Sequence, residues 1–341
     1  MAVADEQIVA LAGTARDDVD RKRFLKAALS VGTGMLVSGH HGAPAADDVN
    51  DLKTALSGPT VHYRRMEQAV SSHQLAPSVE GHLALARSIV DQRLRTSTGF
   101  AALAEIAGLA AWLAADRGDQ ASARRRYTEA VQHAKRAHHP LLVSYMTASL
   151  GHFTVESGDP RRGVVLFDRA HTQLDASAPD SARAWLASLR AVAYAELGDR
   201  TAAYASLRTA ETLTSRQRGE PAWPWVFTFD EAKASRYHAA AFARLGDTRA
   251  ATTAFHAAQP ALISPKPRAL IVLDHARVLV RTGQIAHGCA LATEALQIGR
   301  DYGSERIIAG VRAFRAELPS RAADIRALDE SLTAFYEEET W

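Results

Sequence analysis

Few residues in this sequence have the types and spacing that catalysis or metal binding requires. The chain contains 14 histidines, but no His-x-x-x-His or His-x-x-Glu-His run places two metal ligands on one helix face. His152 and Glu156 lie four residues apart, and a structural or pH-sensing role suits them better than catalysis. The single cysteine, Cys289, cannot form an intramolecular disulfide and is expected to be an inert buried thiol in a reducing, cytoplasmic setting. We therefore expect no enzyme activity, no metal and no cofactor.

Charged and aromatic residues recur where one face of successive helices would present them. Two positions before each of five spaced glycines stand Asp116, Glu156, Glu196, Arg244 and Arg281. The candidate ligand-binding residues on this face are Trp112, Asp116, Tyr145, His152, Glu156, Trp185, Lys233, Arg236 and Arg277. Their order predicts a groove with an acidic, aromatic end and a basic end, where arginine forks would bind a peptide carboxylate. The alternative is that the rings pack against neighbouring helices and the charges are solvated or pair with one another.

An internal repeat defines the elements that would position these residues. Glycine followed by Asp or Gln recurs at Gly118, Gly158, Gly198, Gly246 and Gly283, with helical periodicity on either side. Glycine commonly ends a helix in the left-handed conformation, and a following Asp can cap the next helix. Each unit is therefore predicted to be a helix, a tight turn and a second helix.

Small residues at fixed offsets make the repeat more specific. Alanine stands twelve residues after every one of these glycines, at Ala130, Ala170, Ala210, Ala258 and Ala295. A small residue also lies seven positions before each glycine and five after it, and a bulkier apolar residue follows nine after it in four of the five units. This pattern resembles the tetratricopeptide repeat. The predicted fold is all-α, a right-handed superhelix of helix-turn-helix repeats, and the alternative is an ordinary alanine-rich helical bundle.

The repeat divides the chain into four parts. We expect an N-terminal helix and flexible linker over 1–60, two leading helices over 61–103, five repeats over 104–303 and capping helices over 304–341. Within these parts, helices are expected to begin at Tyr63 and to cover Val79–Arg95, Ser304–Glu317 and Arg321–Tyr336.

The longest interval between the glycines contains two tryptophans and two prolines. Trp223 and Trp225 are expected to form a loop over the groove or to begin the next helix. Asp230 and Glu231 are expected to stand at the start of that helix, where negative charge is favoured by the helix dipole.

Charge and hydropathy exclude two classes of partner for the chain as a whole. The 40 basic and 38 acidic residues leave a net charge of +2, so the broad basic field that wraps nucleic acid is missing. The longest stretch without charged residues, 27–46, is rich in glycine and polar residues, and we expect no membrane span there.

The stretch from Asp20 to Lys26 is basic and precedes an apolar run that leads to Ala43-Pro44-Ala45. It predicts either a twin-arginine export signal or a cytoplasmic linker helix. The pair Arg21-Lys22 is not two arginines, and acidic residues precede it, which favours the linker helix.

Three segments carry a closer resemblance: WLAADRGD at 112–119, PW at 224–225 leading to FDEA at 229–232, and ALATEAL at 290–296. Together they resemble the C-terminal half of actinobacterial XRE-type transcriptional regulators, which join an N-terminal helix-turn-helix to a tetratricopeptide sensor. Residues 19–25 are similar to the segment that links the two parts. A DNA-reading domain of that kind needs about 55–60 residues before the linker. Only 18 residues precede Val19, so we expect no direct DNA binding by this chain. Under this resemblance the chain is either a sensor paralogue without a DNA reader or a shortened regulator.

The resemblance implies a regulatory sensor that binds a peptide, a small-molecule effector or a protein partner in its concave groove and acts on transcription or development. A homodimer is possible under this hypothesis, and no membrane partner is expected. Two alternatives stay open: a constitutive scaffold or homo-oligomerisation module without an effector, and an exported binding protein.

Overall fold

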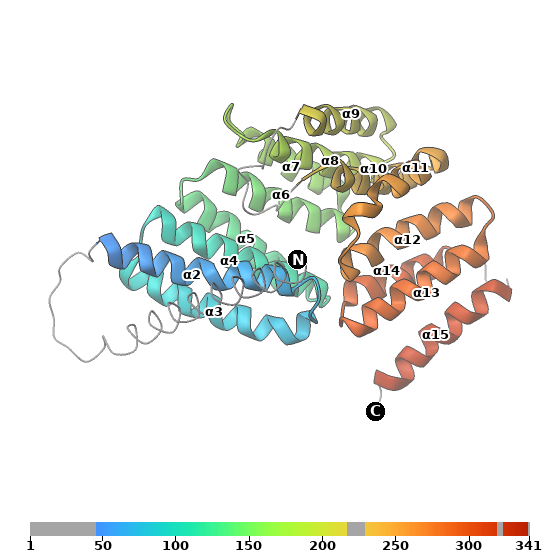
Figure 1. Ribbon diagram of the computed structural model, residues 1–341, viewed down its shortest axis with the longest axis horizontal. Coiled ribbons are helices and arrows are strands. Elements are labelled where there is room, and N and C mark those ends of the chain that lie inside the picture. The colour runs from blue at the N-terminus through green and yellow to red at the C-terminus, as the bar shows by residue number, and fades with distance from the viewer. Residues whose placement is uncertain (1–45, 217–228, 319–322, 340–341) are drawn as a thin grey trace, which may run out of the picture.

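A computed structural model describes residues 46–216, 229–318 and 323–339 of the 341-residue chain (Figure 1). Within these ranges every regular element is a helix, which makes the architecture all-α. The elements are α2 (Ala46–Met66), α3 (Ser72–Arg93), α4 (Ser97–Asp116), α5 (Gln120–Arg136), α6 (Pro140–Glu156), α7 (Pro160–Thr172), α8 (Asp180–Glu196), α9 (Arg200–Arg216), α10 (Glu231–Leu245), α11 (Thr248–Ala258), the short 3₁₀ helix η2 (Gln259–Ala261), α12 (Pro265–Arg281), α13 (Ile285–Asp301), α14 (Glu305–Ala316) and α15 (Ala323–Glu339).

The predicted helix-turn-helix units are confirmed as hairpins α4–α5, α6–α7, α8–α9, α10–α11 and α12–α13. All five turn glycines adopt left-handed φ values between +74° and +89°. In the first four hairpins the aspartate after the glycine accepts a hydrogen bond from the backbone N–H three residues later, at 2.9 to 3.1 Å. Local chemistry alone therefore sets these turns.

The small-residue positions of the repeat lie where the two helices of each hairpin meet. All five of the repeated alanines, from Ala130 to Ala295, are fully buried. The approach is close enough that a Cβ added to Gly151 would lie 2.7 Å from Cε1 of Phe167, the buried bulky residue of the second hairpin. Stacking of these hairpins produces an α-solenoid.

The helices follow an arch, from α2–α5 at one end, through α8 and α10, to α12–α15 at the other (Figure 1). The closing helix α14 agrees with the sequence prediction, α3 covers most of the predicted Val79–Arg95 but begins earlier, at Ser72, and the expectation for Tyr63 is wrong. A helix was expected to begin there, and instead α2 runs from Ala46 and ends at Met66. Gly58 and Pro59 suggest a break, yet Leu56 is buried, so packing against the rest of the protein holds the helix together.

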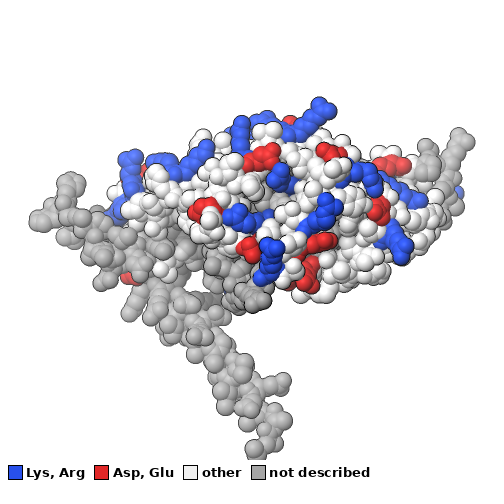
Figure 2. Space-filling model, turned by 90° about the horizontal axis from the view of Figure 1, so that it is seen from above, with Lys and Arg blue, Asp and Glu red and all other residues white. Residues whose placement is uncertain are grey.

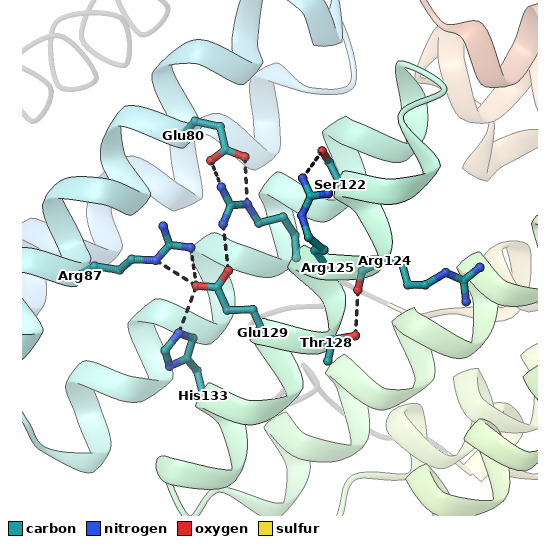
Figure 3. A network of polar contacts seen from close by, with 9 residues as sticks. Glu80, Arg87, Ser122, Arg124, Arg125, Thr128, Glu129 and His133 are labelled. Carbon is teal, nitrogen blue, oxygen red and sulfur yellow. Dashed lines mark hydrogen bonds and ion pairs between the residues drawn. The ribbon is translucent and has the colours of Figure 1, made fainter.

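An ionic network fastens α3 to α5 at the first end of the arch (Figure 3). Arg126 donates to Glu80 at 2.6 Å and to Glu129 at 3.0 Å, and Arg87 reaches the same Glu129 at 2.5 Å. Burial acts to raise the pKa of Glu129, but the hydrogen bonds from His133, Arg87 and Arg126 outweigh it and lower the pKa to about 2. Glu129 therefore stays ionised through the ordinary acid range.

Four other expectations concern particular residues and segments. Cys289 is buried, as expected, and Asp230 caps α10 by accepting a hydrogen bond from the backbone N–H of Lys233 at 2.9 Å. The export or linker segment and the Trp223 and Trp225 loop lie outside the described residues.

Among the described helices, α4 is the one long and apolar enough to span a membrane by length and composition. Because 78% of that stretch is buried inside the protein, it has the character of a core helix.

Replacing Phe167 by alanine tests the packing of the repeat. Phe167 is fully buried, so its truncation is expected to lower the free energy of unfolding by about 3–5 kcal/mol. Val165 on the same helix is 49% exposed, and Val165→Ala is the matched control with an expected change within about 0.5 kcal/mol. Urea unfolding followed by circular dichroism measures both, and equal losses would contradict the packing described here.

His238 makes stability depend on pH. It is 6% exposed on α10, and burial lowers its pKa to about 4. Glu211 Oε1 lies 3.6 Å from its Nδ1, but that carboxylate is 59% exposed and is screened by water. The unfolded chain binds this proton with a pKa of about 6.5, so between pH 6.5 and 4 the unfolded state holds more protons. With respect to this group, the protein therefore has its full stability above pH 6.5. As the pH falls from 6.5 towards 4, the free energy of unfolding decreases by about 1.4 kcal/mol per pH unit.

Urea unfolding at pH 7.0 and 4.5 checks this effect. The variant His238→Phe is expected to lose about 2–3 kcal/mol less than the wild type between the two pH values. The exposed His256 on α11 provides the control His256→Phe, which should follow the wild type. An unchanged pH dependence in His238→Phe would show that this histidine does not stay neutral in the fold.

Candidate binding site on the inner face of the arch

The two ends of the arch meet through a buried ion pair between α4 and α12. Asp116, 1% exposed, accepts a hydrogen bond from Lys266 Nζ at 2.9 Å, and Lys266 is itself 3% exposed. The hydroxyls of Ser72 and Ser304 donate to the two carboxylate oxygens of Asp116 at 2.5 and 2.6 Å. These four side chains come from α3, α4, α12 and the N-cap of α14, so the cluster joins elements almost 200 residues apart in the chain.

Asp116 is held in its ionised form by these neighbours. Burial acts to raise its pKa, but the charges of Arg306 and Lys266 and the two serine hydrogen bonds lower the pKa below its ordinary value. The sequence predicted that Asp116 contacts a ligand. This carboxylate is instead covered by the protein, so it is closed to a ligand.

The inner face of the first two hairpins is covered by the chain itself. The indole N–H of Trp112 donates to Glu67 at 2.8 Å, and the guanidinium of Arg306 stacks on the indole with its central carbon 4.2 Å from the ring centroid. Arg306 also lies 3.3 Å from Glu156, which in turn lies 3.6 Å from His152 Nε2. Predicted groove residues are therefore brought together, but α14 and the residues after α2 already occupy the space between them.

The charges of this cluster shift each other's pKa. Burial lowers the pKa of His152, and the nearby Arg306, Arg236 and Arg244 add to that effect against the opposing charge of Glu156. Burial acts to raise the pKa of Glu156, but Arg306 and His152 outweigh it and lower the pKa. Glu156 is therefore ionised and His152 favours its neutral form.

The predicted aromatic residues pack against each other at the middle of the arch. The rings of Tyr145 and Trp185 lie 5.3 Å apart, and Trp185 is 7% exposed. Trp185 donates to the hydroxyl of Tyr237 at 3.4 Å, and Arg236 donates to the same hydroxyl at 3.1 Å. From the other side, Arg64 of α2 lies within hydrogen-bond reach of Tyr145 at 3.5 Å.

Lys233, on the same helix as Arg236, is half-buried, and desolvation lowers its pKa. This part of the predicted groove is thus packed, as the alternative interpretation of the rings had it.

An open pocket remains farther along the inner face, at the ends of α8, α10, α12 and α14. It has a volume of about 310 Å³ and is lined by Ala195, Glu196, Arg244, Asp274, Arg277, Arg281 and Glu317. Glu196, Arg244, Arg277 and Arg281 stand at positions that the repeat pattern places on the groove face, whereas Asp274 and Glu317 were missed. We name this the ionic pocket.

Opposite charges alternate around the ionic pocket. Arg244 bridges Glu196 at 2.6 Å and Asp274 at 3.1 Å. Arg277 bridges Glu317 at 3.0 Å and the same Asp274 at 3.4 Å. Burial acts to lower the pKa of Arg244, but Asp274 and Glu196 raise it above its ordinary value. Arg281 donates to the backbone carbonyl of Ala243, so the pocket presents three cations and three anions.

This arrangement can bind charged groups of either sign. An arginine that shares a carboxylate with a neighbour can exchange it for the carboxylate of a ligand, because the planar guanidinium donates hydrogen bonds to either carboxylate in the same geometry. Among the described residues, no group of three His, Cys, Asp or Glu side chains is placed to hold a metal ion.

Comparison with known proteins adds one finding. No family model matches the chain, and no curated protein matches it. The crystal structure of BtubC (BKLC) from P. vanneervenii is similar over 74% of this chain and 97% of that chain, with 16% sequence identity and a TM-score of 0.46. A likeness at that level carries no argument about function.

Removing Lys266 tests whether the buried pair closes the arch. Lys266→Met removes the cation that is hydrogen-bonded to the buried Asp116 and leaves only Arg306, at 3.8 Å, near this carboxylate, so the expected loss in the free energy of unfolding is about 3 kcal/mol. Arg268 on the same helix forms an exposed pair with Glu294 at 3.3 Å, so Arg268→Met should change stability by at most about 1 kcal/mol. Urea unfolding gives both values, and small-angle X-ray scattering should show a larger radius of gyration for Lys266→Met alone. Equal behaviour of the two variants would contradict the closure.

Proposed function

We propose that this chain is a tetratricopeptide-type α-solenoid that binds a small ligand with both acidic and basic groups, such as a short peptide, in the ionic pocket and performs no chemistry on it. The positive-φ glycines and buried alanines at constant offsets support this type of repeat. The observation that carries the proposal is the pocket itself, a volume of about 310 Å³ on the inner face surrounded by charges of both signs.

Binding in this pocket is an exchange of ionic partners. A ligand carboxylate replaces Glu317 on Arg277, and a ligand amine replaces Arg244 on Glu196. Because an existing ion pair is given up for each new one, the net gain per contact is small and depends on salt. Selectivity then comes from the distance between the two charges of the ligand.

The resemblance to the sensor half of XRE-type regulators supports a regulatory role for the bound ligand. In this proposal the protein is cytoplasmic and acts on transcription through a partner protein, without reading DNA itself. The arch, closed by Asp116 and Lys266, holds the pocket in one geometry until the ligand binds.

A pool of random short peptides tests the proposal, with retention by the protein measured by mass spectrometry. Peptides with free termini are expected to be retained, and the same pool with acetylated and amidated ends is expected to be lost. Arg277→Gln should weaken a retained peptide by up to about fivefold, since an exchanged, partly exposed ion pair contributes about 0.2–1 kcal/mol. Arg268→Gln, outside the pocket, is the control. Equal retention of capped peptides, or binding unchanged by Arg277→Gln, would count against the ionic pocket.

A further inference from the structure

A second cavity lies on the far side of α8 from the inner face, between α7 and α9. Its α8 residues, Arg183, Leu186, Ala187 and Arg190, are offset by roughly half a turn from the inner-face positions such as Trp185, at 3.6 residues per turn. The cavity has a volume of about 410 Å³, within the range of about 300–1,000 Å³ that ligand clefts occupy. We name it the outer groove.

The outer groove exists because α7 is short. The second helices α5, α9 and α13 have 17 residues each, and α11, with 11 residues, is continued by η2, whereas α7 has 13 residues and ends at Thr172. The chain then turns through residues 173–179 into α8, so the end of α7 leaves part of α8 uncovered beside α9. His171, in the last turn of α7, forms one wall of the groove.

The floor of the outer groove is apolar. Leu186 and Ala187 from α8 meet Ala205 and Leu213 from α9, and most of the exposed lining is apolar. Apolar surface that faces a cleft and is rimmed by polar groups is typical of interaction sites. A bulky apolar side chain of a partner would remove this surface from water.

The rim of the outer groove is basic. Arg183 and Arg190 stand along α8, and Arg216 continues the groove-facing stripe of α9 eleven residues after Ala205. Of the carboxylates near this rim, Asp168 forms an ion pair with Arg190 at 3.1 Å, and Asp175 accepts hydrogen bonds from the backbone N–H and hydroxyl of Ser177.

Arg190 retains an unsatisfied donor. Its Nε is buried and has no hydrogen-bond partner, which is unfavourable for a charged group at the edge of an apolar floor. Arg183 donates to a backbone carbonyl, that of Asp175, and forms no ion pair within the described residues. A carboxylate placed beside Arg183 therefore finds a guanidinium that is free to form an ion pair.

We propose that the outer groove docks an acidic, amphipathic segment of a partner protein, with its apolar side chains against Ala205 and Leu213 and a carboxylate on Arg183. Figure 2 shows that Lys and Arg side chains spread over the surface above these helices, with Asp and Glu between them. The guanidinium of Arg183 attracts an acidic partner, and the apolar floor of the groove selects a partner with large apolar side chains. The inference stands independently of the ionic pocket, which lies on the other side of α8.

Phage-displayed peptides selected on the full chain test the proposal. Selected sequences are expected to combine Asp or Glu with Leu, Phe or Trp. One selected peptide, labelled with a fluorophore, is then titrated with the wild type and with two groove variants. Arg183→Glu reverses a rim charge and Ala205→Trp fills the groove from an exposed position, and each should weaken binding by about tenfold or more.

Arg208 supplies the matched controls, because it is exposed on α9 and does not line the groove. Arg208→Glu and Arg208→Trp make the same two kinds of change and should leave affinity within about twofold. If the basic surface attracted any polyanion without using the groove, Arg208→Glu would weaken binding as much as Arg183→Glu. That result overturns the proposal. Selection of no peptides, or of peptides without acidic residues, overturns it too. Circular dichroism of each variant identifies any loss of fold, and two groove variants keep the test decisive if one is lost.

Discussion

The ion pair between Asp116 and Lys266 is the interaction on which the inner face of this solenoid depends. Two opposite charges buried together stabilise a structure only when their remaining hydrogen-bonding capacity is also met. Here Ser72 and Ser304 supply that capacity, and they come from opposite ends of the arch. The pair can therefore form only when the arch has closed, and closure brings Arg306 over Trp112 and beside Glu156.

The closed arch explains why the candidate site lies away from the predicted aromatic end. The repeat pattern predicts one face for Trp112, Glu156 and Arg277, because positions on a helix face follow from local periodicity. It cannot show that α2 and α14 cover the first two hairpins, since these contacts join residues far apart in the chain. Asp274 and Glu317 of the ionic pocket were missed for the same reason, as their role depends on which helices become neighbours. The alternative of mutual ion pairs describes Glu196 and Arg244 correctly.

The fold itself was more accessible from sequence than the site. The glycine turns and their aspartate caps are determined by interactions within a few residues of the sequence. The burial of the repeated alanines requires only the neighbouring helix of the same hairpin. The exception was α2, where Gly58 and Pro59 argue locally against a helix and tertiary packing overrides them. The outer groove could not be predicted from the sequence for the same reason. The early end of α7 is determined locally, but it opens a groove only because α9 packs beside the uncovered part of α8.

The constant offsets of the hairpins have a consequence for how such a chain can vary. In an open solenoid, a hairpin can be duplicated or lost with little effect beyond its two neighbours, because each repeat contacts only the next. In this protein one hairpin more or fewer would carry Lys266 away from Asp116 and separate Ser72 from Ser304. Closure thus fixes the number of repeats, and lineages of this protein should differ in loop lengths and surface residues while the count of hairpins between α4 and α13 stays the same.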